Sequence, residues 1–127
     1  MIKSLSHRTF VLICIAFMVS LLGCSESPES VGREVIKALV EHDCDRLEEL
    51  ACASRKEEVA KKCSEDELKE WAAELTAREG DLTSLDLTEI RDHNKTPDGE
   101  EMKLYFGRSM DIELVLEEGV WKWTSID

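Results

Sequence analysis

The chain has 127 residues, of which 28 are acidic and 16 basic, so its formal net charge at pH 7 is −12. A surface this acidic excludes nucleic acid as a partner and repels anionic lipid headgroups, so contact with a membrane would need a separate anchor. The length is enough for one small domain with one hydrophobic core and too short for two.

The first residues have the pattern of an export signal. Lys3 and Arg8 precede an apolar stretch that ends in small residues. The 17 residues between Arg8 and Glu26 carry no charge, which is the lower limit for crossing a bilayer. A retained transmembrane helix is therefore the alternative to a cleaved leader.

The end of this stretch, Leu-Leu-Gly-Cys at residues 21–24, resembles the lipobox of bacterial lipoproteins. The resemblance implies that the Cys24 thiol receives a diacylglycerol, that a signal peptidase cuts after Gly23, and that the new amino group is acylated, for example with palmitate. Two or three acyl chains hold a protein on a membrane, whereas one chain binds only marginally. Ser25, in place of Asp, implies by the sorting rule of enteric bacteria the periplasmic face of the outer membrane.

These features predict the organisation of the chain. We expect residues 1–23 to be a lipoprotein signal peptide, residues 24–27 to be the lipidated Cys24 with a short tether, and residues 28–127 to be a single domain.

The first half of this domain is predicted to be helical. Ser27 caps a helix that begins at Pro28 and runs to about His42. Its apolar residues recur every three or four positions, which indicates a broad buried face. Shorter helices are expected over residues 45–52 and 54–62.

Two capping boxes are expected to start later helices. Ser54 with Glu57 and Ser64 with Glu67 both have the spacing in which a hydroxyl and a carboxylate satisfy the first backbone N–H groups. The second box is predicted to open a helix that closes at Gly80.

Three cysteines remain after the anchor, and an oxidising compartment favours one disulfide and one free thiol among them. In a hairpin of the two short helices, Cys52 lies at the turn, while Cys44 and Cys63 meet at the open end. A helix about 15 Å long would separate Cys52 from Cys63, more than the roughly 7 Å that a disulfide allows between Cα atoms. We predict the pair Cys44 and Cys63. The alternative of a zinc site that includes His42 lacks the usual CxxC spacing.

From Asp81 onward apolar residues alternate with polar ones, which predicts strands joined by tight turns. The first strand is expected over residues 82–92, with a bulge near Ile90, where the alternation breaks phase. A turn at residues 94–100 contains Pro97, Asp98 and Gly99. Three more strands follow, and Trp121 and Trp123 share one face of the last. An antiparallel meander with one apolar face needs helices over that face, so the fold class is α+β.

The order of elements is similar to that of small exported lipoproteins in the nuclear transport factor 2-like superfamily, the cystatin-like cone. The similarity rests on the opening SPESVGREVIKALVEHDCDRLEEL and on the final strands in LVLEEGVWKWTSI. It implies N-terminal helices packed on a curved four-stranded antiparallel sheet, often with a pocket at the wide end. It does not imply catalysis, because many members bind or scaffold.

No catalytic residue is assigned from the sequence. Enzymes of this superfamily use an inward Asp with Tyr or Asp donors, whereas the alternation predicts that Tyr105 faces out. His42 is explained by the dipole at a helix end, and His93 beside Asp92 by solvation. The acidic residues around Asp45 are read as the first turn of the second helix and not as a calcium site, because no glycine turn lies near.

We therefore expect a membrane-anchored lipoprotein whose domain binds or scaffolds in the cell envelope, without a cofactor, a metal or enzymatic activity. Its partner would be an envelope protein or a small apolar ligand, bound at the cone mouth or the outer sheet face. A purely structural envelope component is a second possibility. The main alternative is a pocket enzyme of the isomerase or dehydratase type, which needs an inward carboxylate with a raised pKa. The alternation instead places Asp111, Glu113 and Glu117 on the polar face.

Overall fold

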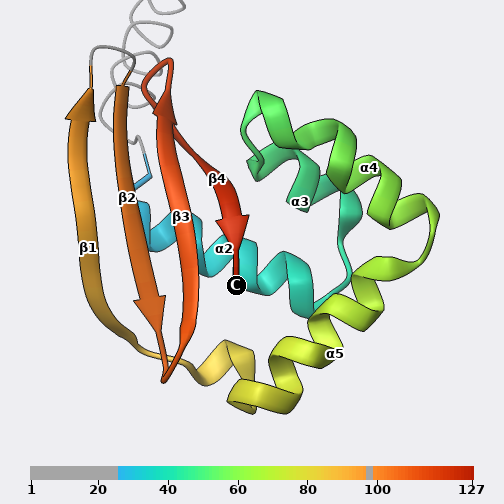
Figure 1. Cartoon of the computed structure of the whole chain (residues 1–127). Helices are drawn as coiled ribbons and strands as arrows, with labels where there is room; N and C mark the ends of the chain where they lie inside the picture. Colours follow the sequence, from blue (N-terminus) through green and yellow to red (C-terminus); the bar gives the residue numbers. More distant parts are fainter. Residues whose placement is uncertain (1–25, 97–98) are drawn as a thin grey trace, which may run out of the picture.

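The computed structural model describes residues 26–96 and 99–127. Its helices precede a four-stranded antiparallel sheet, so the α+β class predicted by the change of period is confirmed. The sheet forms one layer, α2 crosses its inner face, α3 and α4 lie beyond β4, and α5 with η2 lies at the end of the sheet near the β2–β3 turn (Figure 1). The elements are α2 (Pro28–Val40), α3 (Cys44–Leu50), η1 (Ala53–Arg55), α4 (Lys56–Ser64), α5 (Glu67–Glu79), η2 (Leu82–Ser84), β1 (Leu87–Thr96), β2 (Gly99–Phe106), β3 (Met110–Glu117) and β4 (Val120–Ile126).

Helix α2 begins where the sequence predicts and packs directly on the sheet. The Ser27 hydroxyl accepts a hydrogen bond from the Ser30 amide at 3.2 Å, and Pro28 occupies the first turn. A Cβ atom added to Gly32 would lie 2.9 Å from Leu104 Cδ1 and 3.0 Å from Phe106 Cζ. The glycine therefore allows the helix backbone to approach the sheet closely.

The end of α2 comes at Val40, two residues before the predicted end at His42. His42 has a left-handed backbone with φ 54°, and its amide donates to Leu39 O at 3.2 Å. The amide of Asp43 donates to Ala38 O at 2.8 Å. These two bonds form a Schellman motif, which satisfies the last carbonyls and turns the chain toward α3.

The two predicted capping boxes do not form, and this corrects the sequence analysis. Ser64 is the last residue of α4, and its hydroxyl donates to Lys61 O at 2.8 Å. Helix α5 instead starts after Asp66, whose φ is 60°. Ser54 lies in η1, before α4, and its hydroxyl contacts Cys52 Sγ at 3.1 Å. In both cases the serine is already inside helical structure, where its hydroxyl is not positioned to cap.

The first strand starts later than predicted. Residues 82–84 form η2, because the Asp81 carboxylate accepts from the Thr83 amide at 3.1 Å and from its hydroxyl at 2.7 Å. Strand β1 then runs from Leu87 to Thr96, through part of the predicted turn. The bulge expected near Ile90 is confirmed as a register shift between Leu87 and Glu89. Pro97 and Asp98, predicted in the turn, lie outside the described residues.

The sheet separates an apolar inner face from a polar outer face, as the alternation predicts. Cross-strand neighbours on the inner face, such as Leu104 with Ile112 and Leu114 with Trp123, are buried. The Trp123 indole donates to Leu47 O at 3.0 Å and meets Trp71 edge to face at 6.2 Å. This packing joins the last strand to α3 and α5.

Candidate functional site

The residue on which the predicted membrane anchor depends, Cys24, lies outside the described residues. The described chain starts at Glu26, and α2 begins only four residues after Cys24. No helix within residues 26–96 and 99–127 combines the length and hydrophobicity that a membrane span requires. Any anchor at Cys24 would therefore join the folded domain through a very short segment.

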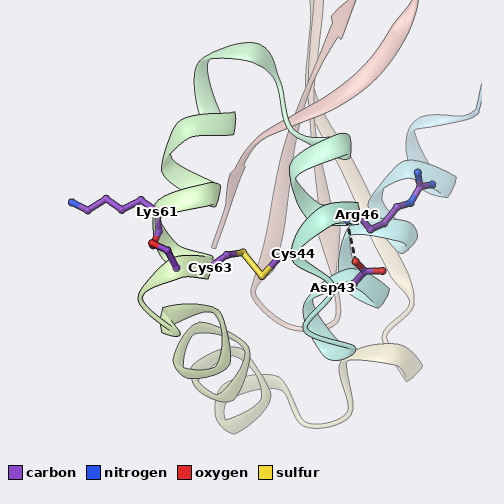
Figure 2. Close-up of a disulfide and its surroundings, with 6 residues drawn as sticks. Asp43, Cys44, Arg46, Lys61 and Cys63 are labelled. Atoms are coloured by element: carbon purple, nitrogen blue, oxygen red, sulfur yellow. Dashed lines mark hydrogen bonds between the residues drawn. A yellow bond between two sulfur atoms is a disulfide. The ribbon is translucent and has the colours of Figure 1, made fainter.

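The structure brings Cys44 and Cys63 together as a disulfide, the pair predicted from the helical hairpin. Their Cα atoms are 6.0 Å apart, and the bond links the start of α3 to the last turn of α4 (Figure 2). Cys52 is a free thiol, 2% exposed, at the other end of α3. The disulfide thus closes the open end of the hairpin.

The acidic residues near the disulfide start α3, as predicted. Asp43 is the N-cap of α3, and its Oδ1 accepts from the Arg46 amide at 3.1 Å (Figure 2). The Arg46 guanidinium lies 3.3 Å from the Glu34 carboxylate and 3.1 Å from that of Glu49. Desolvation lowers the pKa of Arg46, but hydrogen bonds to these two glutamates outweigh it and raise the pKa overall. These residues therefore cap the start of α3 and link it to α2 through the ion pair between Arg46 and Glu34.

The two histidines singled out in the sequence lie at the surface. His42 is exposed after α2, where it occupies the left-handed position of the Schellman motif. His93 Nε2 lies 2.9 Å from Glu100 Oε2 across the β1–β2 hairpin, in an exposed pair. The sequence predicts that His93 is solvated. The structure shows in addition that the Glu100 carboxylate on β2 lies within hydrogen-bond distance of its ring.

A hollow of about 190 Å³ lies on the outer face of the sheet. We call it the outer-face hollow. Lys103 and Glu113 form an ion pair at 3.0 Å within it, and the hydrogen bond to Glu113 raises the pKa of Lys103. The Glu113 side chain is 42% exposed. Its polar lining consists of Asp92, Asn94, Glu101, Lys103, Glu113 and Thr124.

Asp111 lies on β3, and part of its carboxylate is buried. Its Oδ1 is buried and has no hydrogen-bond partner among the described residues. Desolvation is the main reason that its pKa is raised. Asp111 does not line the outer-face hollow, so the carboxylate with the raised pKa is not part of that cavity.

Tyr105 lies on the outer face beside Asp111, as the alternation predicts. It pairs with Asp111 across β2 and β3, and the Arg91 guanidinium lies over its ring at 5.0 Å. The phenol is therefore turned away from the core and cannot serve as an inward donor.

The inner face of the sheet is filled by side chains. Val35, Leu39, Leu104, Phe106 and Ile112 are each 0% exposed. The close approach of Gly32 to Leu104 and Phe106 leaves no room for a ligand at that contact. The inner face therefore offers no ligand site at this contact.

One buried polar contact has no clear sequence signal. The Glu79 side chain, 1% exposed at the end of α5, accepts from the amides of Arg108 and Ser109 at 3.2 and 2.9 Å and from the Ser109 hydroxyl. The Gly-Arg-Ser turn at residues 107–109 marks a hairpin, but its partner is 30 residues away. Glu79 therefore fixes the β2–β3 turn to the helical half.

No family model matches the chain, and no curated protein or solved structure matches it either.

Proposed function

We propose that this protein is a lipid-anchored component of the bacterial cell envelope whose α+β domain binds or scaffolds a partner without catalysis. The disulfide between Cys44 and Cys63 is the structural observation that most supports export, because disulfides form and persist in oxidising compartments. The leader and the Leu-Leu-Gly-Cys sequence before Ser25 support lipidation of Cys24 and a periplasmic location at the outer membrane.

The proposed anchor would keep the domain close to the bilayer. Helix α2 begins at Pro28, so a tether from Cys24 is short. Since the chain is strongly acidic, its surface is repelled by anionic headgroups, and the acyl chains would supply the membrane affinity.

A binding role is supported by where the ionisable groups lie. A pocket enzyme needs an inward ionisable group in an enclosed cavity. The inner side chains of β2 and β3 are apolar and closely packed, whereas Asp111, Glu113 and Glu117 lie on the outer face. Six of the nine residues that line the outer-face hollow are polar and four of these six are charged, which favours an envelope protein over a small apolar ligand as partner.

The finer architecture is also a proposal. Helices followed by a four-stranded meander, with α2 across the inner face, support membership of the nuclear transport factor 2-like cone superfamily. The filled inner face would make this chain a member without the open pocket of the enzymes.

Intact-mass spectrometry of the full chain extracted from membranes tests the anchor. We expect a polypeptide that begins at Cys24 and carries the mass of a diacylglycerol and an added acyl chain. Cys24→Ser should retain residues 1–23 and lose the lipid mass, while Ser25→Ala, which keeps the thiol, should remain lipidated. A mature chain that begins elsewhere, or a Cys24→Ser protein that is still cleaved after Gly23 and still carries the lipid mass, would contradict the proposal.

A further inference from the structure

Strand β1 is an edge of the sheet that is left uncovered by the described residues. It pairs with β2 on one side, and no strand among residues 26–96 and 99–127 pairs with its other side. The opposite edge, β4, is covered: the Cys52 amide donates to Trp123 O at 2.9 Å, and Lys122 Nζ donates to Glu49 O at 2.8 Å. In Figure 1, β1 is the strand farthest from α3 and α4. The backbone groups on the free side of β1 are thus available to another strand.

Ile90, in the middle of this edge, is unusually exposed for its position. It pairs with Leu104 of β2, which is 0% exposed on the inner face of the sheet. Ile90 itself is 50% exposed, because the helices do not cover β1. The apolar inner row of the sheet therefore continues to the edge and ends in a solvent-exposed side chain.

The charges on both sides of Ile90 are self-complementary. Glu89 and Arg91 flank it, and their side chains form an ion pair at 2.6 Å. The neighbour of Arg91 on β2 is Lys103, a like charge. In an antiparallel pair of two β1 strands with the two-fold axis at Ile90, Arg91 of each copy would face Glu89 of the other. Shifting the axis to Arg91 would instead place two guanidinium groups opposite each other.

We propose that β1 pairs with β1 of a second copy of this chain, with the two-fold axis at Ile90, so that two four-stranded sheets become one of eight strands. The pairing continues the inner apolar row through the two Ile90 side chains. It also gives each Arg91 an opposite charge across the strand, an arrangement that stabilises antiparallel pairs. A two-fold axis requires self-complementarity, and this register provides it.

The register shifts of β1 limit the length of this contact. They lie between Leu87 and Glu89 and between Arg91 and Asn94, so the regular stretch that contains Ile90 is only Glu89–Arg91, separate from a second stretch over residues 94–96. Bulges and charged residues commonly shield edge strands from unspecific pairing. Here they restrict pairing to one short register, and the contact is accordingly weak and reversible.

Disulfide trapping of the full chain in whole cells tests the register. Directly opposed residues in an antiparallel ladder have Cα atoms about 4.5–5.5 Å apart, which a disulfide can span. Ile90→Cys should form a covalent dimer under mild oxidation, with the 90–90 linkage identified by mass spectrometry of the joined peptides. Val120→Cys is the matched control, because Val120 is also 50% exposed but lies on β4. Equal trapping of the two variants, or none for Ile90→Cys, would overturn the proposal.

Charge reversal in the Ile90→Cys protein tests the electrostatic complementarity. Glu89→Arg would place two arginines opposite each other twice, and we expect the trapped dimer to fall about five-fold. Adding Arg91→Glu restores opposite charges and should restore trapping. A dimer yield that does not respond to either change would refute the Ile90-centred register. The readout does not require lipid on Cys24, so it stays informative whether or not the anchor proposal holds.

Discussion

Glu79 is a single side chain that joins the two halves of the domain. Its carboxylate is almost fully buried and receives hydrogen bonds from the amides of Arg108 and Ser109. The hydrogen bond from the Ser109 hydroxyl has the largest effect on the pKa of Glu79 and lowers it. Desolvation has the next largest effect and raises this pKa, but the overall shift is downward. A carboxylate held this way stabilises the fold while it is charged.

We predict that Glu79→Gln lowers the free energy of unfolding at pH 7 by about 1–2 kcal/mol, because hydrogen bonds to a charged group are lost. The folded pKa lies below the unfolded one, so this stabilisation is complete above the unfolded pKa and disappears as the pH falls through the folded pKa. Urea denaturation from pH 7 to pH 3 should show the two proteins converge in acid. Glu74→Gln, an exposed change on the same helix, should match the wild type throughout.

The effect of Asp111 on the stability of the fold depends on pH in the opposite way to that of Glu79. Desolvation raises its folded pKa, and its Oδ1 has no hydrogen-bond partner in the described part of the chain. The charged form therefore destabilises the fold at neutral pH, and this cost disappears as the pH falls through the folded pKa toward the unfolded one.

Asp111→Asn should raise the free energy of unfolding at pH 7 by roughly 0.5–1 kcal/mol, since a neutral amide costs less to bury than a carboxylate. The gain should shrink as the pH is lowered toward 4. Asp86→Asn, at an exposed carboxylate, serves as the control in the same denaturation series. A less stable Asp111→Asn protein at pH 7 would show that the charge makes a favourable interaction.

At the scale of elements, the helical hairpin depends on the Cys44–Cys63 bond. Helix α3 has only seven residues and α4 nine, and isolated helices of such length are unstable in water. The disulfide closes a loop with a sequence separation of 19, which restricts the unfolded chain.

Replacing both cysteines with serine should lower the free energy of unfolding by about 3 kcal/mol. Dithiothreitol should destabilise the wild type by a similar amount and leave the double variant unchanged, which separates loss of the bond from effects of the substitutions.

The pairing itself can be tested by labelling, because Cys44→Ser alone should make Cys63 reactive to alkylation. Unchanged labelling of Cys63 would contradict the pairing.

At the scale of the whole molecule, the net charge of −12 works against compactness. The ion pairs between described residues are mostly exposed, for example Arg33 with Glu29 and Arg55 with Glu58, and such pairs contribute little to stability. Repulsion among the remaining acidic groups should therefore outweigh the attraction within these exposed ion pairs.

We predict that raising NaCl from roughly 0.02 M to 0.5 M increases the Tm at pH 7 by a few degrees, because salt screens this repulsion. The effect should largely vanish near pH 4.7, the sequence pI, where the net charge is small. Differential scanning calorimetry at both pH values measures it. A Tm that falls with salt at pH 7 would mean that attractive pairs dominate.

By itself, the sequence determined the main helices and strands, their order and most of their buried faces. Apolar spacing of three and four marked α2, and alternation placed Met102, Leu104 and Phe106 inside, because periodicity is a local property of the chain. The position of Cys52 at a hairpin turn was likewise enough to suggest which cysteines meet.

Tertiary structure alone decided the boundaries and the contacts between distant segments. Ser64 ends α4 instead of capping α5, and residues 82–84 form η2 instead of a strand. The hydrogen bonds from the β2–β3 turn to Glu79 and the exposure of Ile90 depend on where the helices lie relative to the sheet. The physical reason is that such features follow from contacts between residues far apart in the chain, whose energies exceed the small local preferences that a sequence pattern reports.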